Sequence, residues 1–181
     1  MEKHSYDYYE DMAKKAKSHG MLDEAERYYL KSADLREKAL RWSHDSQFRR
    51  NLSVVYILLG DIAKQLERPE DAEAYYQKGL AVIQALVRED NSAYCRRCLG
   101  IAYNRLGDIV RILKGPRKAK KYFEQGLEVH TSIAEETGTE EARQDLVFCY
   151  YRLASVASCI GREKQAEKYR EQARKIERTI T

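Results

Sequence analysis

The chain repeats itself with a period of 47 residues, and this period constrains its fold more than any other feature of its 181 residues. A shift of 47 positions aligns four copies without a gap, and three columns hold one residue type throughout. These columns are Tyr9, Tyr56, Tyr103 and Tyr150; Ala25, Ala72, Ala119 and Ala166; and Tyr28, Tyr75, Tyr122 and Tyr169. Such a period is typical of repeat proteins, in which each unit buries its apolar face against its neighbours.

Small and apolar residues within each copy recur in steps of three and four, which is the spacing of one helix face. Two such stretches lie on either side of Pro69 in the second copy, and Pro116 occupies the same column in the third. Because proline is tolerated in the first turn of a helix, each copy is predicted to hold two helices, A and B. The eight helices are predicted at residues 5–18, 21–42, 46–66, 69–88, 92–113, 116–136, 139–160 and 163–179.

The composition supports an all-α fold, since the chain holds only 2 Pro and 9 Gly. A strand-rich chain needs more turn residues. One hairpin cannot bury both of its faces, so the four hairpins are expected to stack into a solenoid with one continuous core. We therefore predict a single domain over residues 1–181, with repeats at approximately 1–42, 43–89, 90–136 and 137–181.

The apolar columns of the second and third copies follow one motif. It consists of an aromatic residue, a Leu-Gly pair and a small or β-branched residue, then an alanine followed four positions later by an aromatic. Its residues are Tyr56, Leu59, Gly60, Ala63, Ala72 and Tyr76 in one copy, and Tyr103, Leu106, Gly107, Val110, Ala119 and Phe123 in the other. This motif resembles the tetratricopeptide repeat (TPR). The resemblance implies a right-handed α-α superhelical solenoid of four TPR-like hairpins.

The resemblance departs from the usual pattern in length, because the common TPR unit has about 34 residues. It is therefore a resemblance to a long-unit variety, as in kinesin light chain. The segments from Arg50 to Val54 and from Arg143 to Leu146 look like the start of long-unit repeats found in many bacterial multi-repeat proteins. A bacterial source is predicted on this ground.

The resemblance implies a binding function, since members of the family hold a peptide or protein segment in a concave groove lined by their A helices. Carried over by columns, the candidate groove residues are Val54, Ile57, Asp61, Lys64, Ile101, Asn104, Asp108, Arg111, Phe148, Tyr151 and Ser155. The alternative is that Asp61 with Lys64, and Asp108 with Arg111, simply pair on a solvated helix face. We predict a non-catalytic protein-protein interaction module whose partner is a protein or peptide.

Two other functions remain open from the sequence. The basic segment from Lys114 to Lys121 opposes the dipole of the helix that begins there, and could serve an RNA-associated scaffold. The chain could also self-associate through Trp42, Phe48 and Tyr94 near the repeat junctions. Binding of a chaperone's C-terminal carboxylate, known in some members of the family, is disfavoured because Asp61 and Asp108 would repel it.

The sequence offers little for catalysis or for a cofactor. Cys95 and Cys98 form one pair, but Cys149 and Cys159 do not form a second pair with metal-ligand spacing, and the four histidines are scattered. We therefore predict no enzyme activity, no cofactor and no metal. A net charge of +4 and a mean hydropathy of −0.73, without a secretory or membrane-spanning apolar segment, predict a cytoplasmic protein with no membrane contact. The small net charge also disfavours a nucleic-acid partner relative to a protein or peptide partner.

Overall fold

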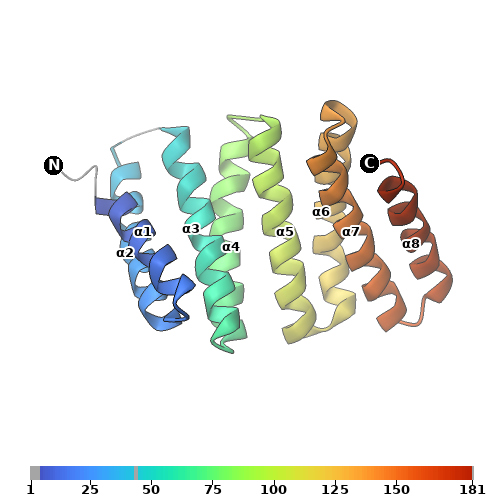
Figure 1. Ribbon diagram of the computed structural model, residues 1–181, viewed down its shortest axis with the longest axis horizontal. Coiled ribbons are helices and arrows are strands. Elements are labelled where there is room, and N and C mark those ends of the chain that lie inside the picture. Colours follow the sequence, from blue (N-terminus) through green and yellow to red (C-terminus); the bar gives the residue numbers. More distant parts are fainter. Residues whose placement is uncertain (1–4, 43–44, 181) are drawn as a thin grey trace. The chain divides into compact units, whose positions relative to one another are not determined.

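A computed structural model describes residues 5–42 and 45–180, and these form eight α-helices and no strand (Figure 1). The helices are α1 (Ser5–Ser18), α2 (Leu22–Leu40), α3 (Ser46–Gln65), α4 (Pro69–Val87), α5 (Ala93–Lys114), α6 (Pro116–Thr137), α7 (Glu140–Cys159) and α8 (Glu163–Glu177). Each predicted helix is found, with bounds that differ by at most two residues. The predicted all-α fold of helical hairpins is confirmed.

The chain divides into two compact units, one up to Asp90 and the other from Asn91 onward. In the first unit α1 packs on α2, α2 on α3, and α3 on α4; in the second, α5 packs on α6, α6 on α7, and α7 on α8. Each unit therefore consists of two consecutive A–B hairpins, with α1, α3, α5 and α7 as the A helices. This division lies one residue beyond residue 89, the predicted end of the second repeat.

The same local signals start the equivalent helices. A side-chain oxygen of the preceding residue caps α3, α5 and α7: Asp45 accepts from Gln47 N at 2.8 Å, Ser92 from Cys95 N at 3.4 Å and Thr139 from Ala142 N at 3.2 Å. Such a cap satisfies one of the backbone N–H groups that a helix start leaves unpaired. Pro69 and Pro116 occupy the first position of α4 and α6.

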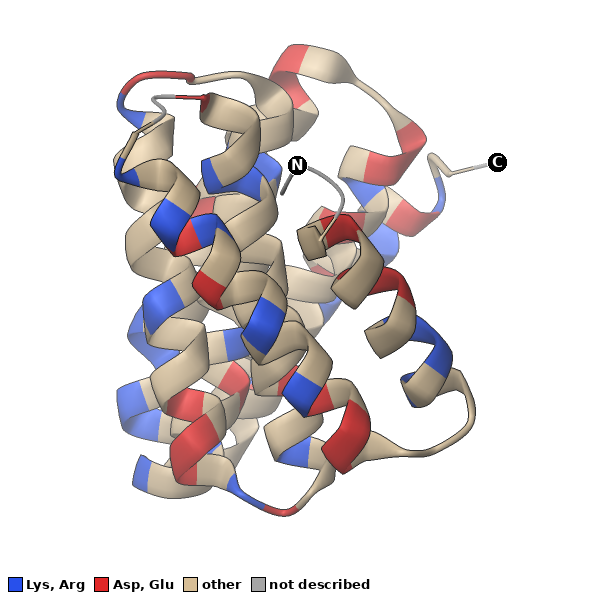
Figure 2. Ribbon diagram, turned by 90° about the vertical axis from the view of Figure 1, so that its left-hand side faces the viewer, with Lys and Arg blue, Asp and Glu red and all other residues tan. Residues whose placement is uncertain are grey.

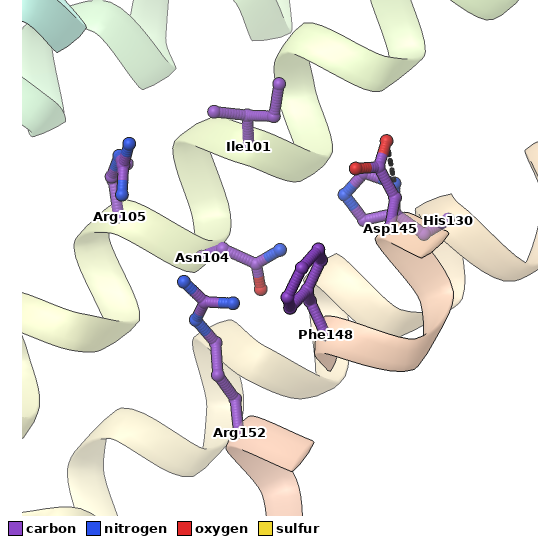
Figure 3. Close-up of a pocket in the computed structure, with 7 residues that line it drawn as sticks. All are labelled: Ile101, Asn104, Arg105, His130, Asp145, Phe148 and Arg152. Atoms are coloured by element: carbon purple, nitrogen blue, oxygen red, sulfur yellow. Dashed lines mark ion pairs between the residues drawn. The ribbon is translucent and has the colours of Figure 1, made fainter. Parts of the chain in front are cut away.

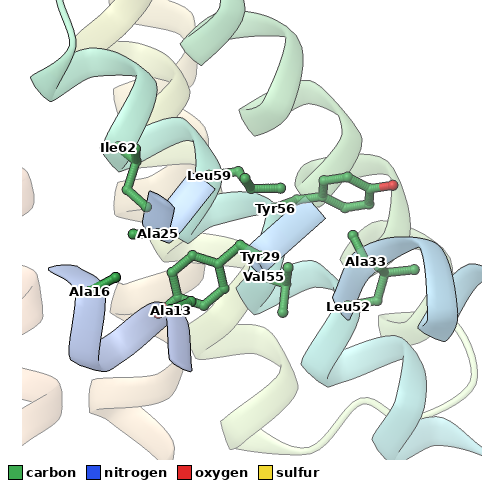
Figure 4. Close-up of a cluster of buried hydrophobic side chains, with 10 residues drawn as sticks. All are labelled: Ala13, Ala16, Ala25, Tyr29, Ala33, Leu52, Val55, Tyr56, Leu59 and Ile62. Atoms are coloured by element: carbon green, nitrogen blue, oxygen red, sulfur yellow. The ribbon is translucent and has the colours of Figure 1, made fainter. Parts of the chain in front are cut away.

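Glycines on the A helices let aromatic side chains of the B helices approach closely. A methyl group at Gly60 would collide with the ring of Tyr76, and one at Gly107 with the ring of Phe123. Both rings are almost completely buried. Alanine and tyrosine dominate the core of the first unit, which Figure 4 shows around Tyr29 and Tyr56.

In the second, third and fourth hairpins, an arginine near the start of the A helix contacts a residue at or just beyond the end of the B helix. Arg49 pairs with Glu89 at 2.6 Å in the first unit, and Arg96 pairs with Glu136 in the second. Arg143, in the same column, donates to the carbonyl oxygen of Thr179 at 2.7 Å. Charged residues of both signs are otherwise interspersed along the helices (Figure 2).

Candidate functional site

A pocket of about 280 Å³ opens in the second unit between α5 and α7, and we name it the α5–α7 pocket (Figure 3). Its lining residues are Ile101, Asn104 and Arg105 from α5, His130 from α6, and Asp145, Phe148 and Arg152 from α7. On α7 the three positions are three, four and seven residues apart, and on α5 Ile101 precedes Asn104 by three residues and Arg105 by four, so both sets lie along one side of their helix. Three of the predicted groove residues, Ile101, Asn104 and Phe148, are thus brought together.

Each carboxylate beside this pocket is bound to an arginine. The Nε of Arg97 donates to Asp145 Oδ2 at 2.5 Å, and this hydrogen bond raises the pKa of Arg97 above its usual value. Arg152 donates through Nη2 to Asp108 Oδ2 at 3.2 Å. Within the described residues Asp108 thus pairs with the next A helix and not with Arg111, the alternative considered from the sequence. The carboxylates are therefore compensated, and the guanidinium of Arg152 is held at the pocket.

His130 forms a polar part of the pocket lining although only 2% of its surface is exposed. Its ring packs on Gly100, where any side chain would collide with it. Its Nδ1 lies 3.8 Å from Asp145 Oδ2, beyond hydrogen-bond distance, and has no hydrogen-bond partner in the described part of the chain. Burial lowers the pKa of His130 below its usual value, with Asp145 opposing and Arg97 and Arg152 reinforcing this shift. The imidazole is therefore neutral at neutral pH.

Asn104 of α5 is held in place by a contact with Cys149 of α7. Its Nδ2 lies 3.3 Å from the Sγ of Cys149, and only 8% of the residue is exposed. Burial raises the pKa of the Cys149 thiol to about 11. This thiol therefore stays protonated and is a poor nucleophile.

A second pocket, of about 300 Å³, lies on the other side of Phe148, and we name it the α7–α8 pocket. Its lining residues are Gln144, Val147, Phe148, Tyr151, Glu177 and Ile180. Tyr151 donates through its hydroxyl to Glu177 Oε2 at 3.0 Å, which links α7 to α8 and raises the pKa of the phenol. Phe148 is 58% exposed and lines both pockets, so it forms a wall between a polar site and a more apolar one.

The other predicted groove residues lie outside these two pockets. Arg111 and Ser155 are exposed on α5 and α7. On α3, in the first unit, Val54 and Lys64 are exposed and Ile57 is half-buried. Asp61, also on α3, accepts a hydrogen bond from the hydroxyl of Tyr76 at 2.6 Å. The acidic side chain that was expected to face a ligand is therefore used inside the hairpin.

Sequence reasoning missed four residues of the α5–α7 pocket: Arg105, His130, Asp145 and Arg152. The groove residues were predicted from equivalent positions of the A helices alone. His130 lies on the B helix α6, so this procedure could not select it. A signal was present, because His130 occupies the column of Ile83, a core residue, and Gly100 provides the space for its ring.

The basic segment from Lys114 to Lys121 and the cysteines offer weaker candidates for a functional site than the α5–α7 pocket does. Lys114 and Arg117 line a pocket of about 410 Å³ with Cys159, and Lys120 is paired with Glu124 at 2.5 Å. No disulfide links Cys95, Cys98, Cys149 or Cys159. The described residues contain no group of three or more His, Cys, Asp or Glu side chains that could hold a metal ion. None of the helices described is long and apolar enough to cross a membrane.

One segment of the chain, within α3 and α4, matches a known sequence family. Residues 54–85 match the tetratricopeptide repeat. The matched segment contains Tyr56, Gly60 and Tyr76, which carry the TPR motif of the second repeat. A comparison with curated protein sequences found no match.

Solved structures of helical repeat proteins resemble the whole chain. BtubC (BKLC) from P. vanneervenii aligns with a TM-score of 0.74 and 22% identity over 97% of this chain and 64% of that one. The apo form of RapI aligns with a TM-score of 0.77 and 14% identity over 97% of this chain and 57% of that one. The de novo designed helical repeat protein DHR64 aligns with a TM-score of 0.53 and 19% identity over 97% and 92% of the two chains.

These similarities establish the fold class and no more, because all three identities are low. The chain spans less than two thirds of the length of BtubC and of RapI. The architecture is an all-α solenoid of TPR-like hairpins, as predicted.

Proposed function

We propose that this chain is a non-catalytic scaffold for protein-protein interaction, and that it binds a peptide or protein segment on the A-helix face of its second unit. TPR-like hairpins and the similarity to helical repeat structures favour an interaction scaffold. The observation that carries the proposal is the exposed ring of Phe148 between two pockets. A large aromatic side chain beside open pockets is the usual form of a binding anchor.

The proposed contact surface consists of Phe148 and Tyr151 on α7 with Ile101 and Asn104 on α5. Asp108 contributes indirectly because it holds Arg152. The extension of a concave groove to Val54, Ile57, Asp61 and Lys64, and to Arg111 and Ser155, stays a prediction. So do the cytoplasmic location and the bacterial source.

We also propose that the structural repeat is the 47-residue unit of the sequence, within a single domain over residues 1–181. The starts of the helices support this period: α3, α5 and α7 begin at residues 46, 93 and 140, and α4, α6 and α8 at residues 69, 116 and 163. The matching caps and the Arg49–Glu89 and Arg96–Glu136 pairs recur at the same interval.

Selection from a displayed library of random peptides tests the proposed function. A selected peptide is then titrated into the intact chain by calorimetry, and into the Phe148→Ala and Tyr8→Ala variants. The two aromatic residues are equally exposed, at 58%, but Tyr8 lies on α1 in the first unit. We expect Phe148→Ala to weaken binding by about tenfold or more, since anchor residues contribute at least about 1–2 kcal/mol, and Tyr8→Ala to change it little.

Equal losses of peptide affinity in the two variants would contradict the proposed surface.

The two alternative functions considered from the sequence predict different outcomes. An RNA-associated scaffold would bind oligonucleotide in a salt-dependent way that is lost on charge reversal of Lys118, Lys120 and Lys121. Self-association would appear as a dimeric mass in solution; Trp42 and Tyr94 are exposed as this alternative requires, but Phe48 packs edge-on against Tyr6, with ring centroids 5.3 Å apart.

A further inference from the structure

His130 lines the α5–α7 pocket, and its Nδ1 is a buried polar atom that has no hydrogen-bond partner among the described residues. The residue is 98% buried, since 2% of its surface is exposed, and Nδ1 has no hydrogen bond within the described residues. The nearest carboxylate oxygen, Oδ2 of Asp145, is 3.8 Å away and already accepts from Arg97. In the tautomer that carries its proton on Nδ1, this buried N–H has no acceptor, which costs free energy, so a ligand oxygen that accepts from it would be bound favourably.

The cationic groups at this pocket favour an anionic acceptor. Arg152 uses Nε and Nη2 to bind Asp108, at 3.3 and 3.2 Å, and this pair does not involve Nη1. Arg105 lines the same pocket from α5 (Figure 3). Because Asp108 and Asp145 are each bound to an arginine, their charges oppose an entering carboxylate only weakly.

The net charge of the second unit also favours an anionic ligand. Lys and Arg outnumber Asp and Glu by 18 to 12 in residues 91–181, a net charge of +6. In residues 1–90 the same groups number 15 and 17, a net charge of −2. The pocket therefore lies in the unit whose long-range field attracts acidic segments.

On the basis of the proposed function, we infer that the α5–α7 pocket binds the carboxylate of an acidic side chain within the partner peptide. The carboxylate accepts from His130 Nδ1 and from Arg152. The α7–α8 pocket then receives a neighbouring apolar side chain of the same peptide, against Val147 and Phe148. Because Phe148 lines both pockets, two neighbouring side chains of one backbone can occupy them together, as an internal Asp or Glu beside an apolar residue would.

The probe is a set of short Ser-Gly peptides, N-acetylated and C-amidated, that carry one Glu and one Leu at the spacings of extended and helical chains. Each has a matched peptide with Gln in place of Glu, and another with Ala in place of Leu. Binding to the intact chain is followed by ¹H–¹⁵N NMR, including the imidazole nitrogens of His130. We expect the best Glu peptide to bind about tenfold more tightly than its Gln partner, with a shift of the His130 Nδ1 resonance.

Protein variants give a second measurement that does not depend on substituting the buried histidine. Arg152→Gln is compared with Lys121→Gln, which removes the same charge from the exposed basic segment of α6 outside the pocket. We expect the first to abolish the preference for Glu over Gln and the second to leave it unchanged. Equal effects of the two variants would overturn the inference, because they would show non-specific attraction.

The outcomes also separate this inference from the proposed function. If Glu and Gln peptides bind equally, with unchanged His130 resonances, the acidic-residue inference fails while peptide binding at Phe148 stands. If neither these peptides nor library-selected ones bind, the proposed function itself fails. If a single-stranded oligonucleotide alone shifts the pocket resonances, the occupant is a nucleic acid and the inference is wrong.

Discussion

Arg36 in the first unit and His130 in the second occupy the same column of the repeat, two repeats apart, and both are buried cationic residue types on B helices. Their surroundings differ completely. Arg36 lies among charged and aromatic groups of its own hairpin, whereas His130 lies against a glycine and lines an open pocket. The comparison shows that one position of the repeat can hold either a charged group paired within its own hairpin or a buried polar residue that lines a pocket.

Arg36 satisfies its charge within the first hairpin. Its Nε donates to Glu10 Oε1 at 2.7 Å and its Nη2 to Asp7 Oδ1 at 3.1 Å. The guanidinium also lies 4.4 Å from the ring centre of Tyr6, which occupies the column of Gly100. A large aromatic residue therefore closes the space in the first unit that a glycine leaves for His130 in the second.

The largest expected effect is a loss of stability on removing the Arg36 side chain. Arg36→Ala should lower the free energy of unfolding of the first unit by about 3–5 kcal/mol, because Glu10 loses its buried partner and a cavity remains. Urea denaturation followed by circular dichroism measures this loss. The control is Lys38→Ala on the same helix, whose pair with Asp34 is exposed and should contribute less than about 1 kcal/mol. Similar losses in both variants would contradict a structural role for Arg36.

A smaller effect tests the contact that gives His130 its space. Gly100→Ala should destabilise the second unit by about 1–3 kcal/mol, because the added methyl group collides with the imidazole ring. This cost exceeds the gain of about 1 kcal/mol in helix propensity. Urea denaturation of Gly100→Ala, His130→Ala and the double variant forms a double-mutant cycle. We expect Gly100→Ala to be harmless once the ring is removed; additive losses would show that the two residues do not interact.

The smallest effect concerns pH and His130, because histidine is the residue type whose ordinary pKa, about 6.5, lies closest to neutrality. Burial lowers the pKa of His130 in the folded state, so the unfolded chain binds more protons below its own value of about 6.5. The stability of the second unit should be complete above that pH and should fall as the pH drops towards the folded value, by at most about 1.4 kcal/mol per pH unit.

Hydrogen exchange followed by mass spectrometry at several pH values between about 5 and 7.5 reports the two units separately. The control is His130→Gln, in which this part of the pH dependence should disappear from the second unit. A second unit whose stability changes with pH equally in the parent and the variant would show that His130 is not the responsible group.

Helices and their order could be predicted from the sequence because the signals for them are local. The steps of three and four, the capping residues such as Asp45 and Thr139, and the prolines at the starts of α4 and α6 all act within a few residues of the helix they define. Gly60 and Gly107 likewise indicated from the sequence that the two helices of the second and third hairpins pack closely.

The candidate site could be predicted only in part. Ile101, Asn104 and Phe148 were expected to lie on one binding face, and they line one pocket. Their predicted roles were less accurate, because side-chain pairing depends on neighbouring helices. Asp108 binds Arg152 across 44 positions of sequence, and Asp145 binds Arg97 across 48. The carboxylate that was expected to repel an anion is thus compensated by a residue from the next repeat.

The sequence by itself determined the repeat, the eight helices within the described residues, and the small-residue columns that let the helices pack closely. Only the tertiary structure decided that His130 reaches a pocket between α5 and α7, that its Nδ1 has no hydrogen-bond partner in the described part of the chain, and that Phe148 lines two pockets. The physical reason is that helix formation follows from contacts three or four residues apart, whereas the polarity of a pocket depends on which distant side chains pair with one another.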